Sequence, residues 1–158
     1  MAGKKVVIIG GGFGGAAAAI ETRTLLESEH TVTLVDRNRE VNLCGMNPML
    51  IAGQRDPRRT TRSLGVLGNR GINVVNAQVD EIDFKNHALS TGDGAIDYDY
   101  LVISAGAEYD WDGTPGAQDA YSFYDIASAR RLRRRLSRMK RGHISIGIAA
   151  TPYKCPPA

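Results

Sequence analysis

The sequence predicts an α/β fold with a mostly parallel sheet and an inserted β-hairpin. Three observations favour this class. The 158 residues, of which 42% are hydrophobic, suffice for one domain with a buried core. An apolar strand at Val6–Ile9 runs directly into a glycine-rich turn. Beyond that turn, segments typical of helices and strands alternate, as they do where parallel strands are joined by crossover helices.

The glycine-rich turn fits the dinucleotide-binding pattern G-x-G-x-x-G at Gly10, Gly12 and Gly15. The first glycine permits a tight turn, and the second lets backbone amides approach a pyrophosphate. The third lets the following helix pack close to the strand, with its N-terminus facing the phosphates. We therefore expect a dinucleotide site here; the alternative is a glycine-rich turn that binds no dinucleotide.

The elements after the turn support the dinucleotide site. We predict a helix at Ala16–Glu27 and a strand at Thr31–Val35. Asp36 ends that strand about twenty residues after the glycines, where an acidic side chain can accept hydrogen bonds from ribose hydroxyl groups.

The rest of the chain continues the alternation of strands, helices and turns. Glycine and asparagine clusters mark the turns, and β-branched runs mark the strands. In order, the predicted elements are a loop with Cys44, a helical stretch at Arg58–Leu67, a strand at Ile72–Val79, a hairpin of Glu81–Phe84 and Ala88–Thr91, a turn at Gly92–Gly94, a buried strand at Tyr98–Gly106, a loop at Trp111–Tyr124 and a strand at His143–Ile148.

The net charge of +3 conceals a strongly basic segment, Arg130–Arg141, with eight basic residues and no acidic one. Leu132, Leu136 and Met139 recur at helical spacing, so we predict an amphipathic helix with a narrow apolar stripe and a broad cationic face. A solvated face on a crossover helix is one interpretation. Contact with an anionic membrane surface or an acidic protein is the other. Nucleic acid is not expected, because no aromatic residues interleave with the basic ones.

Cysteine and histidine spacing excludes several kinds of site. Cys44 and Cys155 lie far apart and form neither a C-x-x-C pair nor a zinc set. The three histidines are isolated, so neither a metal site nor a Ser-His-Asp arrangement is expected. No apolar stretch reaches the roughly 20 residues that span a bilayer. The expected location is the cytoplasm or the membrane periphery, or the periplasm if a signal has been removed.

Taken together, these elements resemble the flavoproteins with two dinucleotide-binding domains that are related to the pyridine nucleotide-disulfide oxidoreductases. VVIIGGGFGG with Asp36 resembles their FAD-binding motif, and YDYLVISAG at Tyr98–Gly106 resembles their second flavin motif, which usually reads YDYLVIATG. Ser104 and Ala105 replace the usual alanine and threonine. The residues for which the resemblance implies contact with FAD are Gly10, Gly12, Phe13, Gly14, Gly15, Asp36, Arg37, Cys44, Val79, Ala105 and Gly106.

The same resemblance implies a domain organisation. Residues 1–110 would form a three-layer, Rossmann-like FAD-binding domain, and residues 111–142 a connecting loop and the basic helix. Residues 143–158 would begin a second dinucleotide-binding-like domain. Because the family's flavin domain is discontinuous, we expect the chain alone to have little sulfide-oxidising turnover, as a fragment or as a chain whose fold a second chain completes.

The last residues, TPYKCPPA, resemble the P-Y-x-C-P-P segment of sulfide:quinone oxidoreductases and flavocytochrome c sulfide dehydrogenases. Relatives that use NADH have a second glycine-rich turn here, whereas prolines remove amide donors. The resemblance implies that Cys155 is redox-active beside the flavin and pairs with a cysteine of the C-terminal half. An inert buried cysteine is the alternative; the adjacent Lys154 would favour a thiolate.

Cys44 has three interpretations. Flavocytochrome-type sulfide dehydrogenases resemble this chain in carrying a cysteine that attaches covalently to the flavin. Single-cysteine NADH oxidases and coenzyme A-disulfide reductases carry a C-G pair, similar to Cys44-Gly45, that cycles through a sulfenate or mixed disulfide. A structural thiol is the third interpretation.

By resemblance, the chain is the N-terminal half of an FAD-dependent oxidoreductase. We expect it to oxidise sulfide or a related thiol, with Cys155 and Cys44 as candidate catalytic residues, and to pass electrons through FAD to a quinone or a cytochrome. One alternative is an NADH-linked flavin disulfide reductase or oxidase with Cys44 as its redox thiol. The other is a truncated, inactive nucleotide-binding module.

Overall fold

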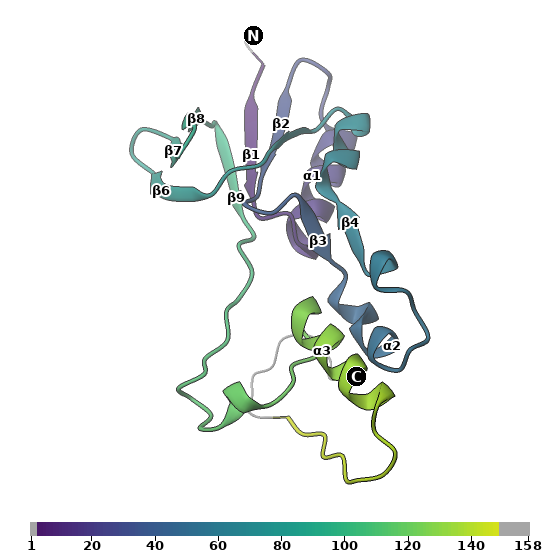
Figure 1. Cartoon of the computed structure of the whole chain (residues 1–158). Helices are drawn as coiled ribbons and strands as arrows, with labels where there is room; N and C mark the ends of the chain where they lie inside the picture. The colour runs from purple at the N-terminus through teal and green to yellow at the C-terminus, as the bar shows by residue number, and fades with distance from the viewer. Residues whose placement is uncertain (1–2, 149–158) are drawn as a thin grey trace. The chain divides into compact units, whose positions relative to one another are not determined.

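The computed structural model describes residues 3–148 and divides the chain into two compact units (Figure 1). The first unit ends at Val41 and resumes over Ser63–Gly106. The second comprises Asn42–Arg62 and the chain from Ala107 onward. The domain boundaries expected after residues 110 and 142 stay a prediction.

The first unit is built on a parallel sheet of four strands in the order β5-β2-β1-β9. Every neighbouring pair in this sheet is parallel, and Val7 of β1 lies between Thr33 of β2 and Leu101 of β9. The predicted strand at Thr31–Val35 is confirmed residue for residue. The strands are β1 (Lys5–Ile9), β2 (Thr31–Val35), β5 (Asn73–Val75) and β9 (Tyr100–Ile103).

Alternation along β1 divides the core of this unit between two faces of the sheet. Val6 and Ile8 belong to a cluster with Ala19 of α1 (Phe13–Leu25) and with Leu64 and Leu67 of the 3₁₀ helix at Leu64–Arg70. Successive strand residues point to opposite faces. The other set, Val7 and Ile9, therefore packs on the opposite side, with residues such as Leu89 and Tyr98.

The second face is covered by a small antiparallel sheet in the order β6-β7-β8, with strands β6 (Val79–Asp83), β7 (Ala88–Thr91) and β8 (Gly94–Asp97). Leu89 of β7 is fully buried against the parallel sheet. The unit thus has three layers: helices, parallel sheet and antiparallel sheet (Figure 1). This confirms the predicted α/β class and its inserted hairpin; the third strand, β8, was not predicted.

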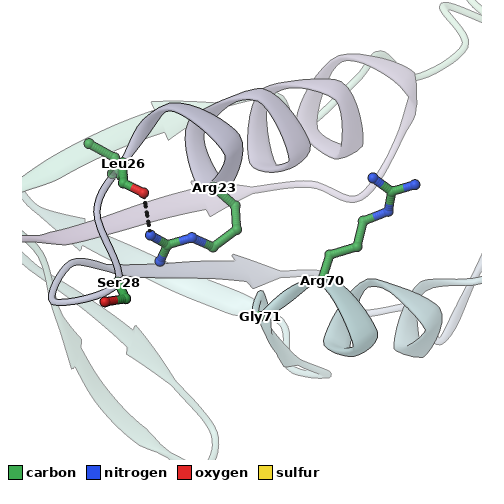
Figure 2. A pocket seen from close by; sticks show the side chains of 5 residues that line it. All are labelled: Arg23, Leu26, Ser28, Arg70 and Gly71. Carbon is green, nitrogen blue, oxygen red and sulfur yellow. Dashed lines mark hydrogen bonds between the residues drawn. The ribbon is translucent and has the colours of Figure 1, made fainter.

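Helix α1 begins at Phe13, three residues before the predicted start, and ends at Leu25. Its C-terminus is stabilised by Arg23, whose guanidinium donates to the carbonyl oxygens of Leu26, Glu27 and His30 at 2.6–2.8 Å. Figure 2 shows the Arg23 side chain turned toward Leu26 at the edge of a shallow surface pocket. A cationic group at this end also complements the helix dipole.

The helical stretch predicted at Arg58–Leu67 is wrong. The chain forms a 3₁₀ helix at Pro57–Arg59, strand β4 at Thr61–Ser63 and the second 3₁₀ helix at Leu64–Arg70. Side chains explain the interruption, because Asp56 accepts from the Arg58 amide at 2.8 Å and Ser63 accepts from the Gly65 amide at 3.2 Å. Each cap starts a new short helix and so breaks a continuous one.

The strand predicted at Ile72–Val79 is also shorter than expected. It ends at Val75, and Val79 instead begins β6. The Asn76 side chain donates to the Asp36 carbonyl oxygen at 3.0 Å, which ties the end of β5 to the end of β2.

In the second unit, α2 (Asn47–Ile51) packs against α3 (Ile126–Ser137). Leu50, Ile51 and Ala129 form the buried centre. Helix α3 begins four residues before the predicted segment Arg130–Arg141, because Asp125 caps it by accepting from the Ser128 amide at 2.6 Å.

Two further segments complete the described chain. Strand β3 (Glu40–Asn42) pairs with β4 in a two-stranded sheet. The strand predicted at His143–Ile148 is wrong for this structure: these residues have no regular secondary structure, and Ile144, Ile146 and Ile148 are exposed. Within residues 3–148 no strand pairs with them, and a strand needs a neighbour to satisfy its backbone hydrogen bonds.

Candidate functional site

The glycine-rich turn lies where β1 ends and α1 begins. Gly10 has a φ of +93°, and its amide donates to the Val35 carbonyl oxygen at 2.8 Å. A β-carbon on Gly10 would lie 2.2 Å from the Ser104 carbonyl oxygen. Both its backbone conformation and its close approach to the end of β9 therefore require glycine.

The other two motif glycines have different surroundings. A β-carbon on Gly15 would lie 1.7 Å from the Gly10 carbonyl oxygen, so α1 packs against the turn only because residue 15 is glycine. A β-carbon on Gly12 would have nothing within 4 Å. Gly12 is also the N-cap of α1, and it has no side chain to offer to the first-turn amides. The surface at Gly12 is thus open to a ligand that accepts hydrogen bonds.

Asp36 holds the turn from the end of β2. Its Oδ2 accepts from the Gly11 amide at 2.6 Å, and its Oδ1 accepts from the Asn38 amide at 2.6 Å. The side chain is half-buried. The predicted acidic position is therefore beside the glycines, and it contributes to the shape of the turn as well as a negative charge.

The C-terminal end of β9 lies beside the glycine-rich turn. The Ser104 amide donates to the Ile9 carbonyl oxygen at 2.8 Å, and the Ser104 Oγ is 2.8 Å from where a β-carbon on Gly14 would lie. Ala105 and Gly106 follow and are exposed, with a φ of +85° at Gly106. The two sequence motifs thus meet at the carboxyl ends of β1, β2 and β9, where ligands bind in open α/β sheets.

Sequence reasoning missed two residues of this region as site residues, Ser104 and Asn76. The Asn76 side chain joins Asp36 to Arg39: its amide nitrogen donates to the Asp36 carbonyl oxygen, and its Oδ1 accepts from the Arg39 Nε at 3.0 Å. The signal for Ser104 was its replacement of the usual alanine in the second motif. No local sequence signal marks Asn76.

The remaining predicted site residues are more dispersed. Phe13 and Arg37 are exposed close to the turn in sequence, while Val79 packs against the second core cluster at the start of β6. Cys44 is half-buried in a short 3₁₀ helix, Cys44–Met46, of the second unit. Cys155 lies outside the described residues. Among residues 3–148 no group of three histidine, cysteine or carboxylate side chains could hold a metal ion.

An ion-paired network lies at the opposite, amino ends of β1 and β9. The Asp99 carboxylate accepts from the Lys5 amide at 2.7 Å and from the Lys4 Nζ at 2.9 Å. These contacts lower the pKa of Asp99, the Lys5 amide contributing most, and the Asp99 hydrogen bond raises the pKa of Lys4. The network fixes where the two strands start and takes no part in the candidate site.

Comparisons with known proteins identify a family and several relatives of this chain. The family model described as Pyridine nucleotide-disulphide oxidoreductase matches residues 4–147. The Alternative NAD(P)H-ubiquinone oxidoreductase C1, chloroplastic/mitochondrial, of Arabidopsis thaliana is 30% identical over 92% of this chain and 32% of its own length. The mitochondrial sulfide:quinone oxidoreductase of Mus musculus is 22% identical over 96% of this chain and 35% of its own length.

A solved structure supports the fold. The sulfide:quinone oxidoreductase of Aquifex aeolicus superposes with a TM-score of 0.77 at 29% identity, covering 85% of this chain and 32% of that chain. The chain therefore spans about a third of the length of the curated relatives it matches.

Proposed function

Because the chain belongs to the pyridine nucleotide-disulphide oxidoreductase family, we propose that it is the FAD-binding part of a flavoprotein that delivers electrons to a quinone or a cytochrome. Members of this family bind FAD. The observation that carries the proposal is the meeting of the glycine turn, Asp36 and the end of β9 at one edge of the sheet.

The residues present fit a dinucleotide. The open surface at Gly12 and the first-turn amides of α1 suit the pyrophosphate, because a helix N-terminus attracts anions. The Asp36 carboxylate retains lone pairs for ribose hydroxyl groups while holding the Gly11 amide. The exposed backbone at Ala105–Gly106 is the proposed contact on the flavin side. When bound, FAD supplies the two-electron chemistry, and the protein supplies binding and orientation.

For the electron donor, we propose sulfide or a related thiol. The cysteine-proline segment around Cys155 and the likeness to the sulfide:quinone oxidoreductase of Aquifex aeolicus support this choice. The proposed role of Cys155 is that of a redox thiolate, and Cys44 is proposed as the point of covalent flavin attachment.

A second candidate function is NADH-linked reduction of a quinone or a disulfide. The 30% identity to the NAD(P)H-ubiquinone oxidoreductase of Arabidopsis thaliana and the Cys44-Gly45 pair favour it. A third candidate, from another class, is an inactive nucleotide-binding module.

The first test is an absorbance spectrum of the chain, incubated with FAD and then freed of unbound flavin by gel filtration, before and after acid precipitation. Yellow flavin released into the supernatant is the expected result for noncovalent FAD. Flavin retained in the pellet, and lost from the pellet of Cys44→Ser, would assign Cys44 to covalent attachment. No flavin in either fraction would overturn FAD binding by this chain.

The donor is tested separately. Bound flavin is mixed anaerobically with sulfide or with NADH, and bleaching of its absorbance is followed. Bleaching by sulfide that Cys155→Ser abolishes supports the sulfide proposal, whereas bleaching by NADH alone would replace it with the NADH-linked function.

A further inference from the structure

The second unit carries a cationic surface that the proposed redox chemistry does not use. We define the basic face as five arginines on α3 and its C-cap, all of them exposed. Eight basic residues lie between Ile126 and Arg141, whereas the one acidic residue next to the helix is its N-cap, Asp125. The five members of the basic face are Arg130, Arg131, Arg134, Arg135 and Arg138.

The apolar side of the same helix is already occupied. Ile126, Leu132 and Leu136 pack against Leu50 and Ile51 of α2. A helix that inserts into a bilayer must turn its apolar stripe toward the acyl chains. Since the apolar stripe of α3 is packed inside its own unit, the exposed side of the helix is cationic.

Those charges are not compensated within the described part of the chain. No ion pair among residues 3–148 includes an arginine of α3. Asp125, the nearest acid in sequence, is engaged with the Ser128 amide and, at 3.3 Å, with the Tyr109 hydroxyl. Like charges three and four residues apart, such as Arg131 with Arg134 and Arg135, disfavour the helix. An anionic partner would remove that repulsion.

A second segment extends the basic surface. Arg133 donates from Nη1 to the Arg55 carbonyl oxygen at 3.1 Å, so the loop after α2 lies beside α3. This loop leads into the 3₁₀ helix that ends with the exposed Arg58 and Arg59. Cationic groups therefore cover more of the second unit than a single helix face.

We propose that the basic face docks this protein onto anionic lipid headgroups by electrostatic attraction. The choice of a lipid surface rests on the proposed function, because a quinone acceptor dissolves in the bilayer and must be met there. Among residues 3–148, no helix is both long and apolar enough to cross a membrane. Attraction of arginines to anionic lipid acts over about a Debye length and is screened by salt.

The test is co-sedimentation of the 158-residue chain with vesicles that contain no quinone. Binding is expected to phosphatidylcholine vesicles containing roughly 30% phosphatidylserine, and not to phosphatidylcholine alone, and it should weaken as salt is raised. The variant Arg131→Gln, Arg134→Gln, Arg135→Gln should bind about 100-fold more weakly, at about five-fold per arginine. Glutamine keeps a similar helix propensity, and circular dichroism checks the fold.

Two matched variants sharpen the result. Lysine at the same three positions preserves the charge and should preserve binding. Glutamine at Lys5, Arg70 and Lys85, exposed residues of the first unit, makes the same change in net charge and should have little effect.

Equal binding to neutral vesicles, or an unchanged affinity of the α3 glutamine variant, would overturn the proposal. Capture of the chain by polyglutamate without binding to vesicles would do the same and assign the basic face to an acidic protein. Because neither flavin nor quinone is present, the outcome is independent of whether the proposed redox function holds.

Discussion

The carboxylate of Asp36 accepts a hydrogen bond of 2.6 Å from the backbone amide of Gly11, twenty-five positions earlier in the chain. This contact joins the acidic end of β2 to the middle of the glycine-rich turn. A second oxygen of the same carboxylate holds the Asn38 amide. One side chain thus shapes both segments that border the proposed nucleotide site.

Replacing Asp36 by asparagine should destabilise the first unit by about 1.5 to 3 kcal/mol, because asparagine has one oxygen for two backbone donors. The proposed FAD affinity should fall about ten-fold with the loss of the carboxylate. Urea denaturation followed by far-ultraviolet circular dichroism and a flavin titration measure the two effects. Asp93→Asn, in an exposed turn, is the control and should change stability by less than about 0.5 kcal/mol. Equal behaviour of the two variants would contradict this role for Asp36.

The motif glycines should separate folding from binding. Gly15→Ala places a β-carbon 1.7 Å from the Gly10 carbonyl oxygen, so a loss of about 3 kcal/mol or more is expected. Gly12→Ala meets no neighbour within 4 Å and should cost about 1 kcal/mol as a poorer N-cap. Its proposed FAD affinity should nevertheless fall more than ten-fold, because a methyl group would occupy the surface offered to the pyrophosphate. A Gly12→Ala variant with unchanged flavin affinity would place the phosphates elsewhere.

Asp99 should confer stability that depends on pH. Its pKa is lowered by the Lys5 amide and the Lys4 side chain, so the stabilisation is present above the ordinary aspartate pKa of 3.8 and is lost as the pH falls through the lower folded value. Asp99→Asn should therefore lower the Tm at neutral pH, and the gap should close in acid. Thermal melts from neutral to acidic pH provide the measurement. Asp97→Asn is the control: its side chain is 70% exposed and 3.7 Å from the Lys5 Nζ, and the substitution should change the Tm at neutral pH only slightly.

The small core of the second unit should depend on Leu50. Leu50 is fully buried against α3, and truncation to alanine should cost about 2 to 5 kcal/mol. The adjacent Met49 is 41% exposed, and Met49→Ala should cost less than about 1 kcal/mol. The single tryptophan, Trp111, lies in this unit, so its fluorescence during urea denaturation reports the difference. Similar losses for the two variants would contradict the packing of α2 on α3.

The sequence predicted the elements whose pattern is set locally. The bounds of β2 follow from a run of mostly β-branched residues that ends at an acidic residue. The glycine-rich turn is predictable because the spacing of its glycines is required by the conformation of the turn. The sequence predicts a later start for α1 because Gly14 and Gly15 have low helix propensity. In the structure both glycines lie in the helix, since the close packing of Gly15 against the turn requires glycine there. The stretch from Arg58 was misassigned because two side-chain caps, not the apolar pattern, decide where its helices begin.

Within the candidate site, contacts between residues far apart in the sequence could not be predicted from local sequence patterns. Asn76 acts through a hydrogen bond to a residue forty positions earlier, and nothing beside it in sequence indicates this. Ser104 could be noted as a departure from a motif, but its proximity to Gly14 follows only from the pairing of β9 with β1.

The pairing of β3 with β4 has a consequence for which unit positions each candidate residue. The chain leaves the first unit along one of these strands and returns along the other, so the two ends of the excursion are adjacent. Residues 43–60 contribute no strand to the parallel sheet, and what they must keep is the apolar contact of Leu50 and Ile51 with α3. Cys44 lies inside this segment, whereas Asp36 and the glycines lie outside it. The position of Cys44 therefore depends on the second unit, whereas the shape of the glycine-rich turn depends on the first.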